Sequence, residues 1–137
     1  MDIEHAARDV LVRNRRETNG FLYTVPSPST YPYQWLWDSC FHAIALAHFD
    51  PETAKSELRS LMAKQFSNGM VPHMIYLEPG ELHNYEWGTV GTSSLTQPPM
   101  IAYAAWEIHR RASDREFLAE IYPGMLAYYR YLVTTRD

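Results

Sequence analysis

The segment from Tyr31 to Ser39 carries the side chains of this sequence that are best suited to chemistry, and it reads YPYQWLWDS. Tyrosine and tryptophan rings cover the apolar C–H faces of a sugar, whereas a carboxylate binds its hydroxyl groups. We therefore interpret Tyr31, Trp35, Trp37 and Asp38 as candidate residues of a sugar-binding pocket. Each also has a structural interpretation, because Asp38 would serve as a helix N-cap and the rings would serve as packing groups.

A second polar segment, from Ser94 to Pro99, supplies one more candidate. Gln97 precedes two prolines, which restrict its backbone, and its side chain offers both a donor and an acceptor to a sugar. The alternative is that Gln97 only leads into a helix. His73 is a weaker candidate for the same cavity, because a lone histidine is more often structural. Residues 85–87 are predicted to form a lid.

The sequence lacks the patterns of the common cofactor and metal sites. Cys40 is the only cysteine, no two histidines stand at the i, i+4 spacing of a zinc helix, and no dinucleotide-binding glycine motif occurs. We expect no cofactor and no bound metal. The net charge of −4 argues against a nucleic-acid partner, which would need a basic surface. We interpret Arg13, Arg15 and Arg16 as the solvated face of a helix.

The composition is that of one globular domain at most. The chain has 137 residues, of which 46% are hydrophobic and 20% are charged. The N-terminus is amphipathic and charged, which is not typical of a signal peptide. The most apolar stretch, from Cys40 to Phe49, is too short to span a bilayer. We therefore expect a cytoplasmic protein that has no membrane partner.

Hydrophobic periodicity predicts an all-α fold with about five helices. These run from Ile3 to Arg16, from Asp38 or Ser39 to Phe49, from Pro51 to Phe66, from Pro98 to Arg111 and from Ser113 or Asp114 to Leu132. Asp50 and Pro51 together form a helix-start signal. Pro123 predicts a kink or a break near Ile121. No strand pattern is convincing, and residues 71–77 are at most extended.

The connections between the predicted helices alternate in length. The second and third helices follow each other directly, as do the fourth and fifth, whereas residues 17–37 and 67–97 form long connections. Long loops inside a compact domain are usually functional. The alternation predicts helical hairpins of a toroid, whose inner helices run parallel and begin at one common end. Asp38 and Gln97 would then lie at neighbouring helix starts and share one pocket.

Three ordered motifs of the chain resemble those of a known enzyme family. The motifs are Tyr31-x-x-x-Trp35-x-Trp37-Asp38, then NGMVPH at residues 68–73, then Thr96-Gln97-Pro98. Together they resemble glycoside hydrolase family 63 and its clan G relatives, especially the mannosylglycerate and glucosylglycerate hydrolases. The resemblance extends over nearly the whole chain, and it depends on the ordered set rather than on any single motif.

This resemblance implies a fold, a reaction and a set of binding residues. The family fold is an (α/α)6 barrel, of which this chain would form about five of the twelve helices. The family hydrolyses α-glycosidic bonds with inversion, so the expected partner is a sugar or a glycoside substrate. The residues that match the family's −1 sugar subsite are Tyr31, Trp35, Trp37, Asp38 and Gln97. Tyr76 or Tyr85 would face the aglycone.

The chain departs from the family in a respect that bears on activity. The family's general acid and base lie in motifs further along the sequence, and neither motif occurs before Asp137. We therefore expect residues 1–137 to be the N-terminal part of a larger barrel, to contain no catalytic pair, and to be inactive without the missing C-terminal part. The alternative is a self-contained helical module that binds a carbohydrate or another protein.

Overall fold

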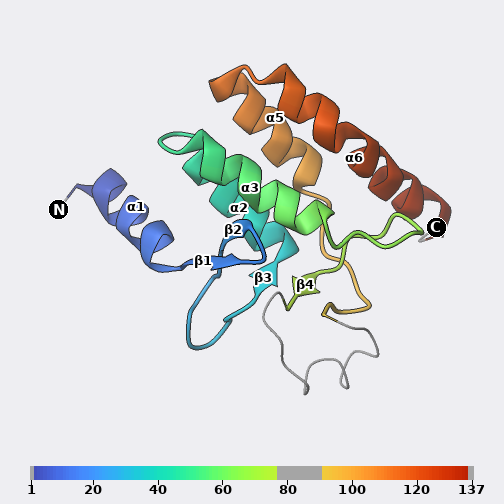
Figure 1. The fold of residues 1–137 in the computed structure, drawn as a ribbon, viewed down its shortest axis with the longest axis horizontal. Helices are drawn as coiled ribbons and strands as arrows, with labels where there is room; N and C mark the ends of the chain where they lie inside the picture. Colours follow the sequence, from blue (N-terminus) through green and yellow to red (C-terminus); the bar gives the residue numbers. More distant parts are fainter. Residues whose placement is uncertain (1, 77–90, 136–137) are drawn as a thin grey trace.

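The computed structural model describes residues 2–76 and 91–135, and within these ranges the fold is mostly helical with two small sheets. Five helices and four strands follow one another along the described chain, as Figure 1 shows. They are α1 (Ile3–Arg13), β1 (Arg15–Thr18), β2 (Phe21–Thr24), β3 (Gln34–Trp35), α2 (Leu36–Leu46), α3 (Pro51–Met62), β4 (Met74–Ile75), α5 (Ile101–Ala112) and α6 (Arg115–Thr135).

Helices α2, α3, α5 and α6 form the body of the molecule. Helix α3 packs against α2, α5 and α6, while α5 also packs against α2 and α6, so the four helices share one apolar core (Figure 1). Its fully buried members include Leu36, Leu58, Ile108 and Phe117. Burying one such side chain stabilises the fold by about 1.5–3 kcal/mol. Strands β3 and β4 pair antiparallel at the start of α2.

Aspartate side chains cap the N-terminal ends of two of these helices. At α3, the Asp50 carboxylate accepts hydrogen bonds from the Thr53 backbone N–H at 3.2 Å and from the Thr53 hydroxyl at 2.7 Å. At α6, the Asp114 carboxylate accepts the backbone N–H of Phe117 at 2.9 Å. These bonds satisfy N–H groups that have no partner inside the helix. Both helix starts agree with the sequence prediction.

The all-α prediction is wrong between residues 14 and 24, where a β-hairpin replaces the end of the predicted first helix. Helix α1 ends at Arg13, and β1 then pairs antiparallel with β2. The turn between the strands is Asn19-Gly20, with φ of 53° and 78°. Asn-Gly favours this two-residue turn because both residues tolerate positive φ. The turn signal was present in the sequence, but the sequence prediction did not use it.

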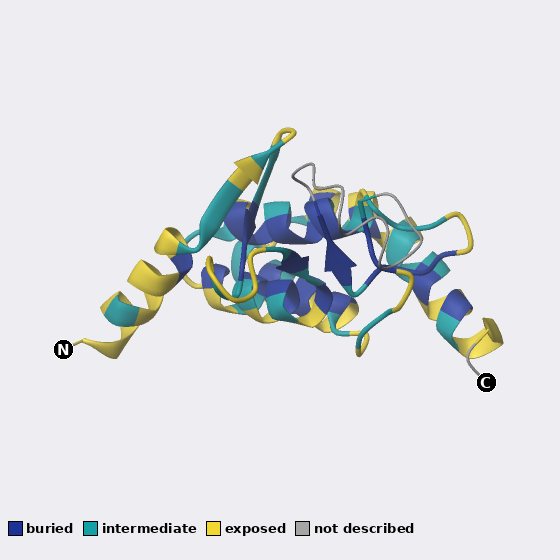
Figure 2. Ribbon diagram, turned by 90° about the horizontal axis from the view of Figure 1, so that it is seen from below, coloured by how far each residue is buried: buried dark blue, intermediate teal, exposed yellow. Residues whose placement is uncertain are grey.

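Arg15 and Arg16 therefore lie on a strand and not on a solvated helix face. The Arg15 guanidinium is half-buried, and its Nη2 atom lies 3.0 Å from Asp50 Oδ2, so the hairpin is tied to the start of α3. A second tie is the Leu22 backbone N–H, which donates to Ser56 Oγ at 3.0 Å. Figure 2 shows the hairpin and the mostly exposed α1 projecting from the helical body.

Three further helix predictions differ from the structure. Helix α2 begins at Leu36, so Asp38 lies in its first turn and is not its N-cap. Helix α5 begins at Ile101, after the two prolines that were expected in its first turn. Helix α6 continues through Pro123, so the predicted break is wrong, whereas the alternative of a kink stays a prediction. Pro123 is exposed, and buried side chains before and after it hold both halves of the helix against the body.

The loop after α3 passes close to the backbone of α6. Gly69 has φ of 94°, a conformation that favours glycine, and a Cβ atom there would clash with the carbonyl oxygen of Ala127. The loop then enters β4. The extended conformation predicted for residues 71–77 is thus confirmed at Met74–Ile75.

The described residues show part of the predicted architecture. The short connections between α2 and α3 and between α5 and α6 agree with two helical hairpins. A closed toroid of twelve helices stays a prediction. None of the helices in residues 2–76 and 91–135 combines the length and the apolar character that crossing a membrane requires.

Candidate functional site

The five residues predicted from the sequence surround one cavity. This cavity, which we call the aromatic pocket, has a volume of about 280 Å³. It is lined by Pro26, Tyr31, Trp35, Trp37, Asp38 and Gln97. The pocket thus joins the segment that enters α2 to the segment that enters α5. The predicted sharing of one pocket by Asp38 and Gln97 is confirmed as geometry, whereas their role in binding stays a prediction.

Asp38 reaches the pocket from the first turn of α2. Partial burial raises the pKa of its carboxyl group, while hydrogen bonds from its own backbone and from the Trp37 side chain act against this shift. The N-terminal end of a helix favours a nearby negative charge. Asp38 is the one charged side chain among the described residues that line the pocket. A carboxylate at this position can accept hydrogen bonds from hydroxyl groups.

The aromatic rings differ in how far they are exposed. Tyr31 is 52% exposed and Trp37 is 41% exposed, so both have ring surface available to a ligand. Trp35 is more buried and makes edge contacts with the Tyr31 ring at 5.9 Å and with the His73 ring at 5.2 Å between centroids. Trp35 therefore anchors the segment, whereas Tyr31 and Trp37 offer the more accessible surfaces.

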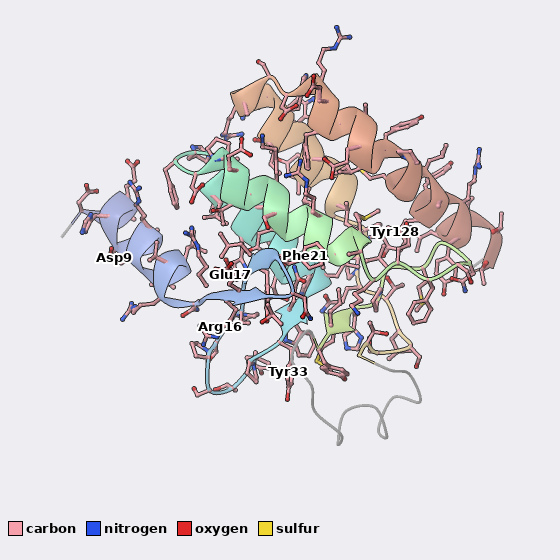
Figure 3. All side chains as sticks on the ribbon, viewed as in Figure 1. Asp9, Arg16, Glu17, Phe21, Tyr33 and Tyr128 are labelled. Carbon is pink, nitrogen blue, oxygen red and sulfur yellow. The ribbon has the colours of Figure 1, made fainter. Side chains whose placement is uncertain are left out.

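Gln97 connects the two segments directly. Its Oε1 atom accepts the backbone N–H of Trp37 at 3.1 Å, which satisfies a donor in the first turn of α2. The Gln97 carbonyl oxygen accepts the hydroxyl of Tyr128 at 2.9 Å. Figure 3 labels Tyr128 on α6. Helix α6 therefore helps to fix the loop that carries Gln97.

His73 contacts the Trp35 ring but is not among the residues that line the pocket. Its carbonyl oxygen accepts the Leu36 backbone N–H at 2.9 Å, and its ring Nδ1 lies 2.6 Å from Ser93 Oγ. Burial lowers the pKa of the imidazole. These contacts place His73 against Trp35 and the start of α2, which agrees with the structural interpretation.

Pro26 is the lining residue that the sequence prediction missed. It lies between β2 and the Tyr31 segment, where Ser27 and Tyr31 form a bridge that folds this loop back on itself. The only signal was a pair of prolines at residues 26 and 28, which is typical of many loops. Loop composition alone does not predict which proline faces a cavity.

Two other predictions concern residues near the pocket. The Tyr76 ring is buried and packs edge-on against Tyr33 at 5.0 Å between centroids, and Tyr76 does not line the pocket. Figure 3 labels Tyr33 on the segment that leads into β3. The predicted lid, residues 85–87, lies outside the described residues, as does Tyr85 as a possible contact for the aglycone.

A layer of buried polar side chains, two of which are sequence neighbours of the pocket residues Trp35 and Asp38, was not predicted. Its members are all fully buried, and we call them the polar layer: Thr24, Gln34, Ser39, Glu57 and Ser60. Burial raises the pKa of Glu57 to about 8, although the neighbouring Thr24 and Ser39 and the charge of Arg15 act against this shift. The Glu57 carboxyl is therefore mostly protonated at neutral pH.

The described residues contain no cluster of three or more His, Cys, Asp or Glu side chains arranged to hold a metal ion. The residues that line the aromatic pocket offer ring surface, one carboxylate and one amide. Aromatic walls with a few fixed polar groups are typical of small-molecule sites.

Comparison with known proteins gives consistent matches. Residues 31–137 match a family model described as the mannosylglycerate hydrolase MGH1-like glycoside hydrolase domain. The mannosylglycerate hydrolase of Thermus thermophilus is 36% identical over 96% of this chain and 34% of its own length. The mannosylglycerate hydrolase MGH1 of Selaginella moellendorffii is 33% identical over 96% of this chain and 28% of its own length. The glucosylglycerate hydrolase of Mycolicibacterium hassiacum is 32% identical over 83% of this chain and 30% of its own length.

The fold is also similar to a solved structure. The crystal structure of a family 63 mannosylglycerate hydrolase from Thermus thermophilus, in complex with Tris and D-glycerate, matches with a TM-score of 0.85 and 36% identity. The match covers 95% of this chain and 32% of that chain. The chain thus spans about a third of the length of these relatives.

Proposed function

Because this chain belongs to the mannosylglycerate hydrolase MGH1-like family of glycoside hydrolases, we propose that it is the N-terminal segment of an inverting α-glycosidase. Its part in the enzyme is to supply residues of the −1 sugar subsite. One observation carries this proposal: the five residues expected in that subsite, from two distant segments, line a single cavity. They are Tyr31, Trp35, Trp37, Asp38 and Gln97.

Each group has a distinct role in the proposed subsite. The Asp38 carboxylate accepts hydrogen bonds from two neighbouring hydroxyls of the sugar, and each such bond to a charged group contributes about 1.5–3 kcal/mol. The exposed surfaces of Tyr31 and Trp37 cover the apolar C–H face of the ring. Gln97 fixes the Trp37 backbone and presents its amide at the pocket wall.

The catalytic pair is proposed to come from outside this chain. An inverting glycosidase needs an acid and a base about 6.5–9.5 Å apart, with room for a water molecule between the base and the sugar. Asp38 is the one carboxylate among the described residues that lines the pocket. A carboxylate that binds sugar hydroxyls does not supply a second group for this chemistry, so the remainder of the barrel must do so.

The surface of the described residues supports this interpretation. Phe41 on α2 and Tyr103 and Trp106 on α5 are each at least 50% exposed. The Tyr103 and Trp106 rings stack on each other at 6.3 Å between centroids. In the proposed enzyme, the remaining helices of the barrel cover these faces.

The proposed substrates are mannosyl and glucosyl glycosides of glycerate, after the names of the relatives. The charge of the aromatic pocket suits the neutral sugar and not the glycerate. Its single charged lining residue is an aspartate, which repels a carboxylate at neutral pH. The glycerate is therefore bound beyond the residues that line this pocket.

The test uses the full-length protein, which is the enzyme of which this chain is the proposed N-terminal segment. The substrates are mannosylglycerate and glucosylglycerate, and the measured quantity is glycerate release. Asp38→Ala should lower kcat/KM by about 100-fold, because it removes charged hydrogen bonds worth about 2.7 kcal/mol. Trp35→Ala should also lower kcat/KM, and Asp9→Ala on the exposed face of α1 is the matched control. The proposal fails if wild type releases no glycerate, or if Asp38→Ala and Asp9→Ala have equal activity.

The self-contained binding module is separated from this proposal by a second measurement. If residues 1–137 alone bind the sugar as tightly as the full-length protein does, the module is favoured. The enzyme proposal expects no hydrolysis and weaker binding by residues 1–137 alone, since the subsite is then incomplete.

A further inference from the structure

Gln34 precedes the pocket residue Trp35 in β3 and does not itself line the aromatic pocket. Its side chain is fully buried. The Nε2 atom lies 2.6 Å from Ser60 Oγ, 3.0 Å from Ser39 Oγ and 3.2 Å from the backbone oxygen of Glu57. The contact with a carbonyl oxygen fixes the orientation of the amide, because only its nitrogen can donate to that oxygen. Gln34 thus links β3 to both α2 and α3.

Gln34 and Ser39 are each next in sequence to a residue that lines the aromatic pocket. Gln34 precedes Trp35 on β3, and successive side chains of a strand point to opposite faces. With Gln34 held in the core, Trp35 must therefore point toward the pocket. Ser39 follows Asp38 in the first turn of α2, so the same amide also fixes the helical turn that carries the carboxylate.

We propose that Gln34 is a positioning residue that sets the placement of Trp35 and Asp38 for sugar binding through its hydrogen bonds to Ser39, Ser60 and the Glu57 backbone. This inference rests on the proposed function of the aromatic pocket. A shift of one residue in β3 would turn Trp35 into the core and Gln34 toward the pocket. The directional amide bonds oppose that shift.

The geometry distinguishes this role from simple core filling. The Gln34 Oε1 atom is buried and has no hydrogen-bond partner among the described residues, which costs stability. An apolar side chain of similar volume would fill the same space without that cost. The amide fixes the orientation of β3, because its two N–H groups face acceptors on α2 and α3. An apolar side chain makes no directional bond and would not hold β3 in one register.

The experiment compares three variants of the full-length protein: Gln34→Leu, the triple variant Gln34→Leu/Ser39→Ala/Ser60→Ala, and Ile121→Ala. The single variant removes the donors and leaves their acceptors buried. The triple variant replaces the side-chain partners together, which restores much of the lost stability. Ile121→Ala is the matched control, because it removes a buried apolar side chain of α6 that is not a member of the polar layer.

Three kinds of measurement are made at a temperature at which every variant is folded. Urea unfolding gives the midpoint, steady-state kinetics give KM and kcat for the glycerate glycoside, and NMR gives the indole N–H resonances of 15N-labelled tryptophan. We expect both Gln34 variants to raise KM by about 10- to 100-fold and to shift the Trp35 resonance. Ile121→Ala should lower the urea midpoint and leave KM and that resonance unchanged.

The positioning role is overturned if KM follows the urea midpoint across all variants, so that the triple variant recovers both or Ile121→Ala raises KM as much as Gln34→Leu does. If Gln34→Leu does not fold, Ser60→Ala removes one acceptor only and is judged by the same comparison. Failure of the proposed function is recognised by a different result, namely that wild type releases no glycerate. In that case the tryptophan resonances still show whether Gln34 sets the placement of Trp35.

Discussion

The aromatic pocket and the contact between α3, α5 and α6, which we call the helix seam, are held together by different interactions. At the pocket, the first turn of α2 is fixed by single hydrogen bonds to the His73 carbonyl and to the Gln97 side chain. In the helix seam, Leu58, Ile108 and Phe117 are fully buried against one another's helices. The pocket is thus held by directional hydrogen bonds, whereas the seam is held by apolar burial.

This difference separates recognition from stability. Apolar burial is non-directional and contributes most of the folding free energy, whereas one hydrogen bond adds only about 1 kcal/mol net but fixes an orientation. Changes in the helix seam should therefore alter the free energy of unfolding and leave the affinity for the proposed sugar ligand unchanged in the folded protein. Changes at the pocket should do the reverse.

The largest effect is expected in the helix seam. Phe117→Ala in the full-length protein should lower the free energy of unfolding by about 3–5 kcal/mol, because it removes a fully buried ring and leaves a cavity. The ring is also covered by the Arg59 guanidinium at 5.3 Å. Urea denaturation measures the loss, and KM for the proposed glycerate glycoside substrate should stay within about twofold of wild type, in keeping with separate sites acting independently.

Tyr122→Ala is the control on the same helix. Tyr122 is 59% exposed, so its removal should change the free energy of unfolding by less than about 0.5 kcal/mol. The division between seam and pocket is refuted if Phe117→Ala raises KM as strongly as Asp38→Ala while the protein is still folded.

The sequence predicted the helix seam well because periodic apolar residues carry most of its information. Leu58 and Leu61 on α3 and Ile108 on α5 recur at helical spacing, and all three are fully buried. The hairpin was missed for a local reason. Its strands have only four residues each, and the Asn19-Gly20 turn is a stronger signal than the spacing that suggested a longer first helix.

The pocket residues were predicted by their chemistry, but the groups that hold them were not. Trp35, Asp38 and Gln97 stand out by residue type, and parallel inner helices gave a reason for them to meet. Gln34 and Glu57 carry no such signal, because a glutamine or a glutamate in a sequence is more often exposed than buried. Only the packing of β3, α2 and α3 shows that these two side chains share the polar layer.

The polar layer joins β3 to α3 through the Gln34 hydrogen bonds and should make stability depend on pH. The pKa of Glu57 is raised from 4.5 to about 8 in the folded protein, mainly because the carboxyl is buried. The folded state therefore binds a proton that the unfolded state releases above pH 5, so stability falls as pH rises. Between pH 6 and pH 8 the loss should be about 2–3 kcal/mol, at up to 1.4 kcal/mol per pH unit.

Glu57→Gln tests this dependence, since its amide does not titrate in this range. Urea unfolding of wild type and Glu57→Gln at pH 6, 7 and 8 should give a difference that shifts in favour of the variant as pH rises. A difference that is constant over these pH values would show that Glu57 does not change its protonation between the folded and unfolded states.

The smallest effect concerns a directional bond that is far from the pocket. Asp50→Ala removes the side-chain acceptor at the start of α3 and the partner of Arg15, so the full-length protein should lose about 1–2 kcal/mol in free energy of unfolding. Asp50→Asn keeps an oxygen that can accept the Thr53 N–H and should lose less than half of that amount. Both variants should retain wild-type KM, because α3 begins at the end of the helical body away from Asp38. If Asp50→Ala raised KM while Asp50→Asn did not, a hydrogen bond at the start of α3 would influence the pocket. The separation of pocket and helix seam would then be contradicted.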